Sequence, residues 1–190
     1  MLLLNGCVIS KDFSQPESNM LINKKILMVI APIDFRDAEY NEPLKVFLAN
    51  GAEVKTASIQ SGTSIGAEGT KVNIDLTVSQ VAVEDFDVVV FIGGPGMAQI
   101  TDDESLQILA RKFYQPGKLT AAICVAPAIL AKAGILKGKN ATAWLGAQND
   151  LENGGATFLQ QSVVVDGKII TADGPTSATQ FGEKIIEMMR

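Results

Sequence analysis

The sequence predicts an α/β sandwich, in which helices cover both faces of a mostly parallel sheet. Short apolar runs of strand length alternate along the chain with amphipathic segments of helix length. Two of these runs, "KKILMVIAP" at residues 24–32 and "DFDVVVFIGGPG" at residues 85–96, are apolar almost throughout, which is typical of strands buried on both faces. With 190 residues, 47% of them apolar, the chain is long enough for one globular domain with a large core.

A helix is expected over residues 36–50, directly after the first strand. Asp34 is a candidate N-cap for this helix, and Gly51 is a typical residue to end it. Pro43 lies inside the segment and lacks the N–H that an α-helix uses. We therefore expect the helix to break or restart near Asn41.

The remaining elements continue the alternation of strands and helices. The apolar and polar residues of segment 71–78 alternate, which predicts a half-covered strand. Near the end, Asp166-Gly167 predicts a hairpin turn, and Ser177 with Gln180 predicts a capping box at the start of a closing helix. The other expected elements are strands at residues 52–59 and 118–124, and helices at residues 102–115 and 126–133.

The charge pattern argues against partners that need strong electrostatics. The chain carries 21 acidic and 16 basic residues, a formal charge of −5, and its Lys and Arg residues are scattered. A nucleic-acid-binding protein would show a clustered basic surface, so no nucleic-acid partner is expected. No apolar run approaches 18 residues, so no membrane span is expected either.

The absence of histidine restricts the chemistry further. With 0 His residues, the chain contains no Ser-His-Asp or Cys-His arrangement, and metal sites that depend on His are excluded. We expect no metal and no cofactor. Any catalysis must use other acids and bases, and the partner we expect is a small-molecule substrate.

The first 22 residues look different from the rest. "MLLLNGC" at residues 1–7 resembles the end of a bacterial lipoprotein signal, but its apolar part is too short for one. Residues 1–22 are interpreted as a flexible leader, a mis-assigned start, or the remnant of a signal that would anchor Cys7 to lipid; the domain proper covers residues 23–190. The 2 cysteines fit a reducing compartment, so a cytoplasmic location is expected, with lipid anchoring as the alternative.

Cys124 lies where the strand at residues 118–124 must turn into the helix at residues 126–133. This is the setting of a nucleophile elbow, a strained turn that exposes a reactive side chain at the edge of the sheet. The positive end of the following helix is expected to lower the thiol pKa. Free cysteine is also among the most buried residue types, so simple packing is the alternative.

The glycines at the end of the strand at residues 85–96 allow two interpretations as well. Gly93 and Gly94 match neither a dinucleotide-binding fingerprint nor a phosphate-binding loop. They could form a plain turn. If Cys124 reacts, their N–H groups, at the same edge of the sheet, would form an oxyanion hole.

Several ordered motifs resemble the DJ-1/PfpI superfamily, which has the fold of class I glutamine amidotransferases. They are "APIDFRDAEYNEP", "DFDVVVFIGGPG", "AAICVAPAILAKAGILKGKNAT" and the late "DGKIITADGP", so that the resemblance runs from about residue 24 to residue 190. It implies a flavodoxin-like, three-layer α/β/α sandwich with a nucleophile elbow. It also implies a homodimer or a higher homo-oligomer.

The resemblance also implies roles for individual residues. Cys124 matches the reactive cysteine of the family and Glu39 the acidic residue that contacts it, while Gly94 and the N–H of Val125 match its anion-binding donors. The chain departs from the family's protease-like branch, which has His where Val125 stands. Trp144 falls near the position where relatives of DJ-1 often carry another His, so a Cys-His protease is not expected.

Two classes of function follow from the resemblance. In the first, Cys124 adds to a small reactive carbonyl or amide-like substrate while Glu39 relays protons, in a glyoxalase-like, deglycase-like or amidase-like reaction of a hydrolase or lyase. In the second, the protein is a redox sensor or chaperone-like stress-response protein whose Cys124 is oxidised without turnover. Arg36 near Glu39 is expected to form an exposed salt bridge, with binding of an anionic substrate as the alternative.

Overall fold

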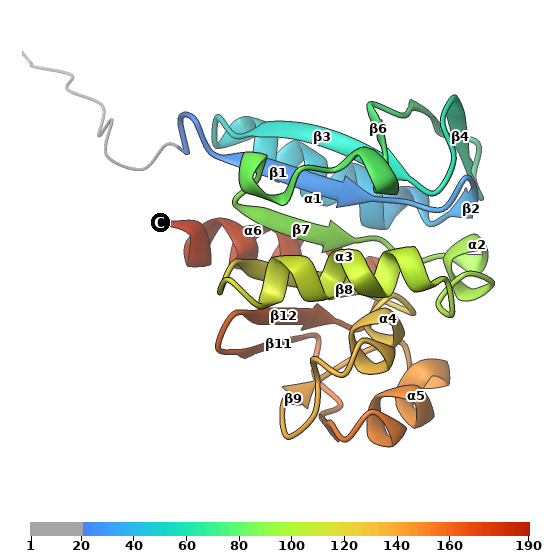
Figure 1. The fold of residues 1–190 in the computed structure, drawn as a ribbon, viewed down its shortest axis with the longest axis vertical. Helices are drawn as coiled ribbons and strands as arrows, with labels where there is room; N and C mark the ends of the chain where they lie inside the picture. The colour runs from blue at the N-terminus through green and yellow to red at the C-terminus, as the bar shows by residue number, and fades with distance from the viewer. Residues whose placement is uncertain (1–20) are drawn as a thin grey trace, which may run out of the picture.

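A seven-stranded sheet runs through the middle of the computed structural model, which describes residues 21–190 (Figure 1). Neighbouring strands are parallel, except that β11 pairs antiparallel with β12. In their order across the sheet the strands are β11 (Val163–Asp166), β12 (Ile169–Ala172), β8 (Leu119–Ile123), β7 (Val88–Phe91), β1 (Lys25–Val29), β3 (Glu53–Ser58) and β6 (Leu76–Thr77). The predicted mostly parallel sheet is thereby confirmed.

Helices cover both faces of this sheet, which confirms the predicted three layers. Figure 1 shows α3 in front of the sheet and α1 and α6 behind it. Successive side chains of β1 point to opposite faces: Met28 belongs to the core under α1 and α6, and Leu27 to the core under α3 and α4. The helices are α1 (Asp37–Ala49), α2 (Pro95–Ala98), α3 (Glu104–Tyr114), α4 (Pro127–Lys132), α5 (Gln148–Asn153) and α6 (Ala178–Met189).

Two smaller sheets flank the central one, and one of them corrects the expected strand at residues 71–78. That segment forms two strands in different sheets, because Asp75 redirects the chain. The backbone N–H of Asp75 donates to the Thr56 carbonyl at 2.9 Å, and its carboxylate accepts from the Thr56 N–H at 2.8 Å. The small sheets contain β2 (Ile33–Phe35), β4 (Thr63–Gly66) and β5 (Lys71–Asn73), and β9 (Asn140–Ala141) and β10 (Thr157–Phe158).

The prediction that Pro43 breaks the first helix is wrong. Helix α1 is continuous through Pro43, which is buried. The proline packs against α6 so closely that a Cβ at Gly182 would lie 3.0 Å from Pro43 Cα. Packing between the two helices therefore compensates for the missing backbone hydrogen bond. Asp34 is not the N-cap either: it has φ of 56°, and the cap position is occupied by Arg36.

The end of the chain folds as the hairpin and closing helix that the sequence predicts, but without the capping box. The Ser177 hydroxyl donates to Asp173 Oδ1 and makes no hydrogen bond to the α6 backbone. The side chain is therefore used to hold the segment before the helix. Within residues 21–190, no helix combines the length and the apolar character needed to cross a bilayer.

Candidate active site

Cys124 follows β8 in a strained backbone conformation. Its φ is 63°, a left-handed value that costs a residue with a Cβ roughly 1–2 kcal/mol. The backbone is fixed on both sides: the Cys124 N–H donates to the Ala172 carbonyl at 2.9 Å, and the Cys124 carbonyl accepts from the Trp144 N–H at 2.9 Å. Helix α4 begins at Pro127, so this turn is the nucleophile elbow that the sequence predicts. The cysteine is partly exposed.

Glu39 reaches the same place from the first turn of α1. Its side chain is fully buried, and its Oε2 accepts a hydrogen bond from the Gly93 N–H at 3.0 Å. Its other oxygen, Oε1, has no hydrogen-bond partner within residues 21–190. A charged carboxylate oxygen that is buried without a hydrogen-bond donor destabilises the folded state. The surroundings of Oε1 therefore favour the protonated form of Glu39.

Gly93 lies between the two reactive side chains. A Cβ built on Gly93 would lie 2.7 Å from Cys124 Cβ and 2.7 Å from Glu39 Oε2. Any side chain here would push the cysteine and the carboxyl group apart. Glycine at this position is therefore required for the pair to approach, and its N–H is already used to bind Glu39.

Gly94 is required for a different reason. Its φ of 114° is unfavourable for other residues, and a Cβ would lie 2.4 Å from the Arg36 nitrogen. This close packing leaves the Gly94 N–H facing the cysteine. The backbone N–H groups of Val125 and Gly94 lie close enough to the Cys124 sulfur to lower the thiol pKa, against the larger effect of burial. The two donors that the family resemblance implied are thus brought to the same sulfur.

The protonation of the pair differs from the sequence expectation. Burial raises the pKa of Glu39 to about 7, against smaller opposing effects of the nearby Cys124 side chain and of the hydrogen bond from the Gly93 N–H. Burial also raises the pKa of the Cys124 thiol to about 12, and the adjacent Glu39 charge and hydrogen bond add to this effect. The expected lowering by the following helix is outweighed, because α4 has only 6 residues and the sulfur is largely desolvated.

These two pKa values describe a pair that loses its first proton near pH 7 and holds one proton above that pH. A thiolate and a carboxylate this close cannot both be charged without strong repulsion. Between these two values the remaining proton resides mainly on the sulfur, and Glu39 is the carboxylate. Nucleophilic attack by the sulfur would need the minor form, in which Glu39 holds the proton and Cys124 is a thiolate.

A cavity of 410 Å³ opens above the sulfur. Arg36 on its wall forms an ion pair with Glu68 at 2.6 Å, so the expected salt bridge is confirmed. The lining residues are Arg36, Gly94, Pro95, Ala98, Cys124, Val125, Trp144 and Pro175. The cavity is mostly apolar, and within residues 21–190 no cluster of three potential metal-ligating side chains is found.

Sequence reasoning placed Trp144 near the site but missed Pro175. Trp144 is half exposed and borders the cavity, and its backbone N–H donates to the Cys124 carbonyl. Pro175 follows β12, whose carboxyl end lies beside that of β8 because the two strands are parallel neighbours. The strand order was the missing signal, since only that order brings Pro175 next to Cys124.

The fold is an α/β sandwich, and its candidate active site is centred on a cysteine. The strained Cys124 and the nearby glycines lie at the carboxyl ends of parallel strands, and Glu39 reaches them from α1. The model of the DJ-1/PfpI family matches residues 24–188. This chain belongs to the DJ-1/PfpI family.

Individual relatives agree over most of the chain. Deglycase PfpI of Pyrococcus furiosus is 32% identical over 166 residues, which cover 87% of this chain and 99% of the relative. Protein MJ0967 of Methanocaldococcus jannaschii is 40% identical over 168 residues, covering 87% of this chain and 82% of the relative. The crystal structure of a ThiJ/PfpI domain protein from Brachyspira murdochii superposes with a TM-score of 0.86 at 37% identity, covering 88% and 96% of the two chains.

Proposed function

We propose that this chain is a cysteine-dependent enzyme that acts on small reactive carbonyl compounds, with Cys124 as the nucleophile. One observation carries the proposal: Cys124, Gly94 and Val125 line a single cavity, and the buried Glu39 is held beside Cys124 by the Gly93 N–H. The relative from Pyrococcus furiosus is named a deglycase, which supports carbonyl chemistry in this family.

The first step is addition. The Cys124 thiolate attacks the aldehyde carbon of an α-dicarbonyl, a carbon–sulfur bond forms, and the electron pair of the carbonyl moves to its oxygen. The N–H groups of Gly94 and Val125 stabilise this oxyanion. Glu39 then gives its proton to the oxygen, which produces a hemithioacetal and leaves Glu39 as a carboxylate.

The second step moves a hydrogen along the substrate. The Glu39 carboxylate removes the proton from the carbon bonded to sulfur, which gives an enediolate. A proton then returns to the neighbouring carbon and the hydroxyl proton moves to that carbon's oxygen, which converts the hemithioacetal into the thioester of a 2-hydroxy acid. Water cleaves the thioester and releases the acid and the thiol. The net reaction adds one water and needs no external oxidant. A pKa of about 7 suits Glu39 to both directions of proton transfer near neutral pH.

A Cys-His peptidase does not fit this chain. The sequence contains 0 His residues, so the cysteine has no imidazole partner within the chain. Assembly of identical subunits would not supply one, because every copy has the same sequence. Glu39 is the acid–base group that the site offers instead.

Turnover tests the proposal directly. Methylglyoxal is the probe, and formation of the 2-hydroxy acid is followed by NMR for wild type, Cys124→Ala and Glu39→Gln. We expect Cys124→Ala to abolish turnover and Glu39→Gln to reduce it about 100-fold or more, the usual contribution of a general acid–base. Turnover retained by Cys124→Ala would refute the cysteine mechanism. A wild type that turns over neither dicarbonyls nor amides, but whose Cys124 gains oxygen from peroxide, would establish the redox-sensing alternative.

The pH dependence of Cys124 alkylation tests whether Cys124 and Glu39 titrate as a coupled pair. Cys7 lies outside the described residues and is replaced by Ser, so that iodoacetamide reports on Cys124 alone. In wild type we expect the alkylation rate to rise as the pair loses its first proton near pH 7. In Glu39→Gln the buried thiol must ionise unaided, and the rise moves to higher pH. Faster alkylation of Glu39→Gln at neutral pH would show that Glu39 only repels the thiolate.

A further inference from the structure

The hairpin formed by β4 and β5 lies against the segment that leads into α1 (Figure 1). Two main-chain hydrogen bonds attach it there. The Ile65 N–H donates to the Pro32 carbonyl at 3.0 Å, and the Ala67 N–H donates to the Phe35 carbonyl at 2.9 Å. The turn between the two strands, residues 67–69, is exposed, so its own side chains do not hold it in place. We call this element the β4–β5 hairpin.

Asp37, in the first turn of α1, anchors the turn of the β4–β5 hairpin. Its side chain is buried, and each of its oxygens accepts a backbone N–H: Oδ2 from Glu68 at 2.8 Å and Oδ1 from Thr70 at 2.7 Å. A Cβ at Gly66 would lie 2.5 Å from Asp37 Oδ1, so glycine at that position lets the carboxylate enter the turn. Burial alone would raise the pKa of Asp37, but interactions with Thr70 and Glu68 lower it, so the anchor is a carboxylate at neutral pH.

The anchored turn brings Glu68 to Arg36, which occupies the N-cap position of α1 and lines the cavity above Cys124. Arg36 Nη1 and Glu68 Oε1 lie 2.6 Å apart. Surface ion pairs are weak when two flexible side chains must find each other. Here Asp37 fixes the backbone of Glu68 and directly follows Arg36 in the chain, so one turn of α1 places both members of the pair.

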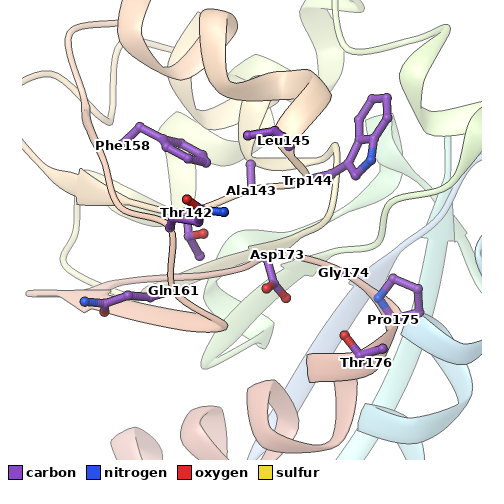
Figure 2. A pocket seen from close by; sticks show the side chains of 11 residues that line it. Thr142, Ala143, Trp144, Leu145, Phe158, Gln161, Asp173, Gly174, Pro175 and Thr176 are labelled. Carbon is purple, nitrogen blue, oxygen red and sulfur yellow. The ribbon is translucent and has the colours of Figure 1, made fainter.

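Arg36 is the only basic side chain that lines the cavity above Cys124 within residues 21–190. Trp144 and Pro175, on other parts of its wall, also line an adjoining cavity of 250 Å³ (Figure 2). In the described part of the chain, the one charged residue that lines this second cavity is Asp173, which is acidic. Arg36 is therefore the group that decides whether an anion is attracted to the site.

The charges around the sulfur sum to a negative value. Once the pair of Cys124 and Glu39 has lost its first proton, it carries one negative charge, whichever group holds the remaining proton. The Arg36 guanidinium would offset this charge, but the adjacent Glu68 carboxylate compensates it. An anionic compound that approaches Cys124 is therefore repelled, and a neutral one is not.

We propose that Glu68, held in place by Asp37, neutralises Arg36 and thereby makes the cavity select neutral carbonyl compounds over anionic ones. This inference rests on the proposed function and names the charge class of its substrate. Asp37 does not line the cavity and is a positioning residue that acts through the β4–β5 hairpin. Loss of either carboxylate leaves an uncompensated guanidinium on the cavity wall.

Alkylation of Cys124 measures this charge without turnover, in protein that carries Cys7→Ser. The reagents are iodoacetate and iodoacetamide, which are similar in size but differ in charge. Both react with the same thiolate, so the ratio of their rates does not depend on the thiol pKa; each ratio is divided by that of N-acetylcysteine. We expect the normalised ratio of wild type to lie below that of the free thiol. Glu68→Gln should raise it about fivefold, the effect of one nearby unit charge in water, and less in high salt.

Three further variants assign the effect. In Asp37→Asn the amide nitrogen meets one of the two backbone N–H groups, so the turn loosens and the ratio should also rise, by a smaller factor; thermal melting checks that the variant folds. Arg36→Gln combined with Glu68→Gln removes the attracting charge and should restore the ratio of wild type. Glu187→Gln removes the same charge from an exposed ion pair with Lys184 in α6 and should leave the ratio unchanged.

The outcomes separate this proposal from the proposed function. An unchanged ratio in Glu68→Gln, a rise that persists without Arg36, or an equal rise in Glu187→Gln would overturn Glu68 as the residue that sets the charge of the cavity. A folded Asp37→Asn protein with the ratio of wild type would overturn the anchoring role; if that variant does not fold, the exposed Glu68→Gln still decides the proposal. None of these results depends on methylglyoxal turnover. A wild type that does not turn over methylglyoxal but shows the expected ratios would refute the enzyme and leave the charge selection.

Discussion

Two glycines at opposite ends of the sheet have left-handed backbones but very different surroundings. Gly94 follows β7 at the candidate active site, with φ of 114°, and Gly167 turns the β11–β12 hairpin, with φ of 63°. A Cβ at Gly94 would lie 2.4 Å from the backbone nitrogen of Arg36, whereas no heavy atom lies within 4 Å of a Cβ at Gly167. Backbone conformation alone requires glycine in the hairpin, while conformation and crowding together require it at the site. Close packing is thus concentrated where the reactive groups meet.

Alanine at each glycine should give the largest contrast between the two ends. Gly94→Ala adds overpacking to left-handed strain, so we expect a loss of about 3 kcal/mol or more in the free energy of unfolding. Gly167→Ala adds strain alone and should cost about 1 kcal/mol. Urea denaturation of both variants measures the difference. Equal losses would mean that the packing around Gly94 relaxes easily.

The two ends of the sheet also differ in the environment of a carboxyl group. Glu39 is buried at the site, and burial raises its pKa to about 7. Asp166, at the hairpin end, accepts the Asn140 N–H and pairs with Lys139, and these interactions lower its pKa. The folded state therefore takes up a proton at Glu39 and releases one at Asp166, so their effects on stability depend on pH in opposite directions.

The second prediction concerns how the stability of wild type and of Glu39→Gln depends on pH. Between the unfolded pKa of Glu39, near 4.5, and its folded value, about 7, the folded state binds more protons, so the stability of wild type falls as pH rises through this window. Glu39→Gln removes the effect, and its advantage over wild type should grow across the window to as much as about 3 kcal/mol. Denaturation midpoints from pH 4 to pH 8 measure it.

Asp166→Asn is the control for that series. The Asp166 carboxylate stabilises the folded state above its unfolded pKa, and this contribution disappears as pH falls through the lower, folded pKa. The variant should therefore differ most from wild type near neutral pH and approach it in acid. A Glu39→Gln curve parallel to that of wild type would show that Glu39 titrates normally in the folded protein.

The parts of this site that the sequence predicts are those encoded locally. An apolar strand followed by Cys124 among small residues predicts the elbow, and Gly93 and Gly94 mark the neighbouring strand end, because each signal lies within one segment. The predictions fail where contacts with a segment distant in the sequence determine the local structure. Pro43 stays in a helix because Gly182 of α6 lets the two helices approach each other closely. Ser177 does not cap α6 because its hydroxyl donates to Asp173 Oδ1.

Sequence reasoning also missed the direction in which the thiol pKa shifts and the position of Pro175 beside the site. The sequence shows the helix that follows Cys124 but not the depth at which the sulfur is buried, and burial is the larger effect. Pro175 reaches the site only because β12 lies next to β8. Local patterns therefore identify the reactive residue, while its protonation and its neighbours depend on tertiary packing.

The smallest predicted effect concerns the third left-handed position, Cys124 itself. Its φ of 63° equals that of Gly167, but Cys124 carries a side chain in this conformation. Cys124→Ala keeps the Cβ and the strain, whereas Cys124→Gly removes both. Since both variants lack the sulfur, their difference isolates the backbone, and Cys124→Gly should be more stable than Cys124→Ala by about 1 kcal/mol. Urea denaturation decides: if Cys124→Ala is equally stable or more stable, the elbow is not strained, and the contrast with the hairpin rests on crowding alone.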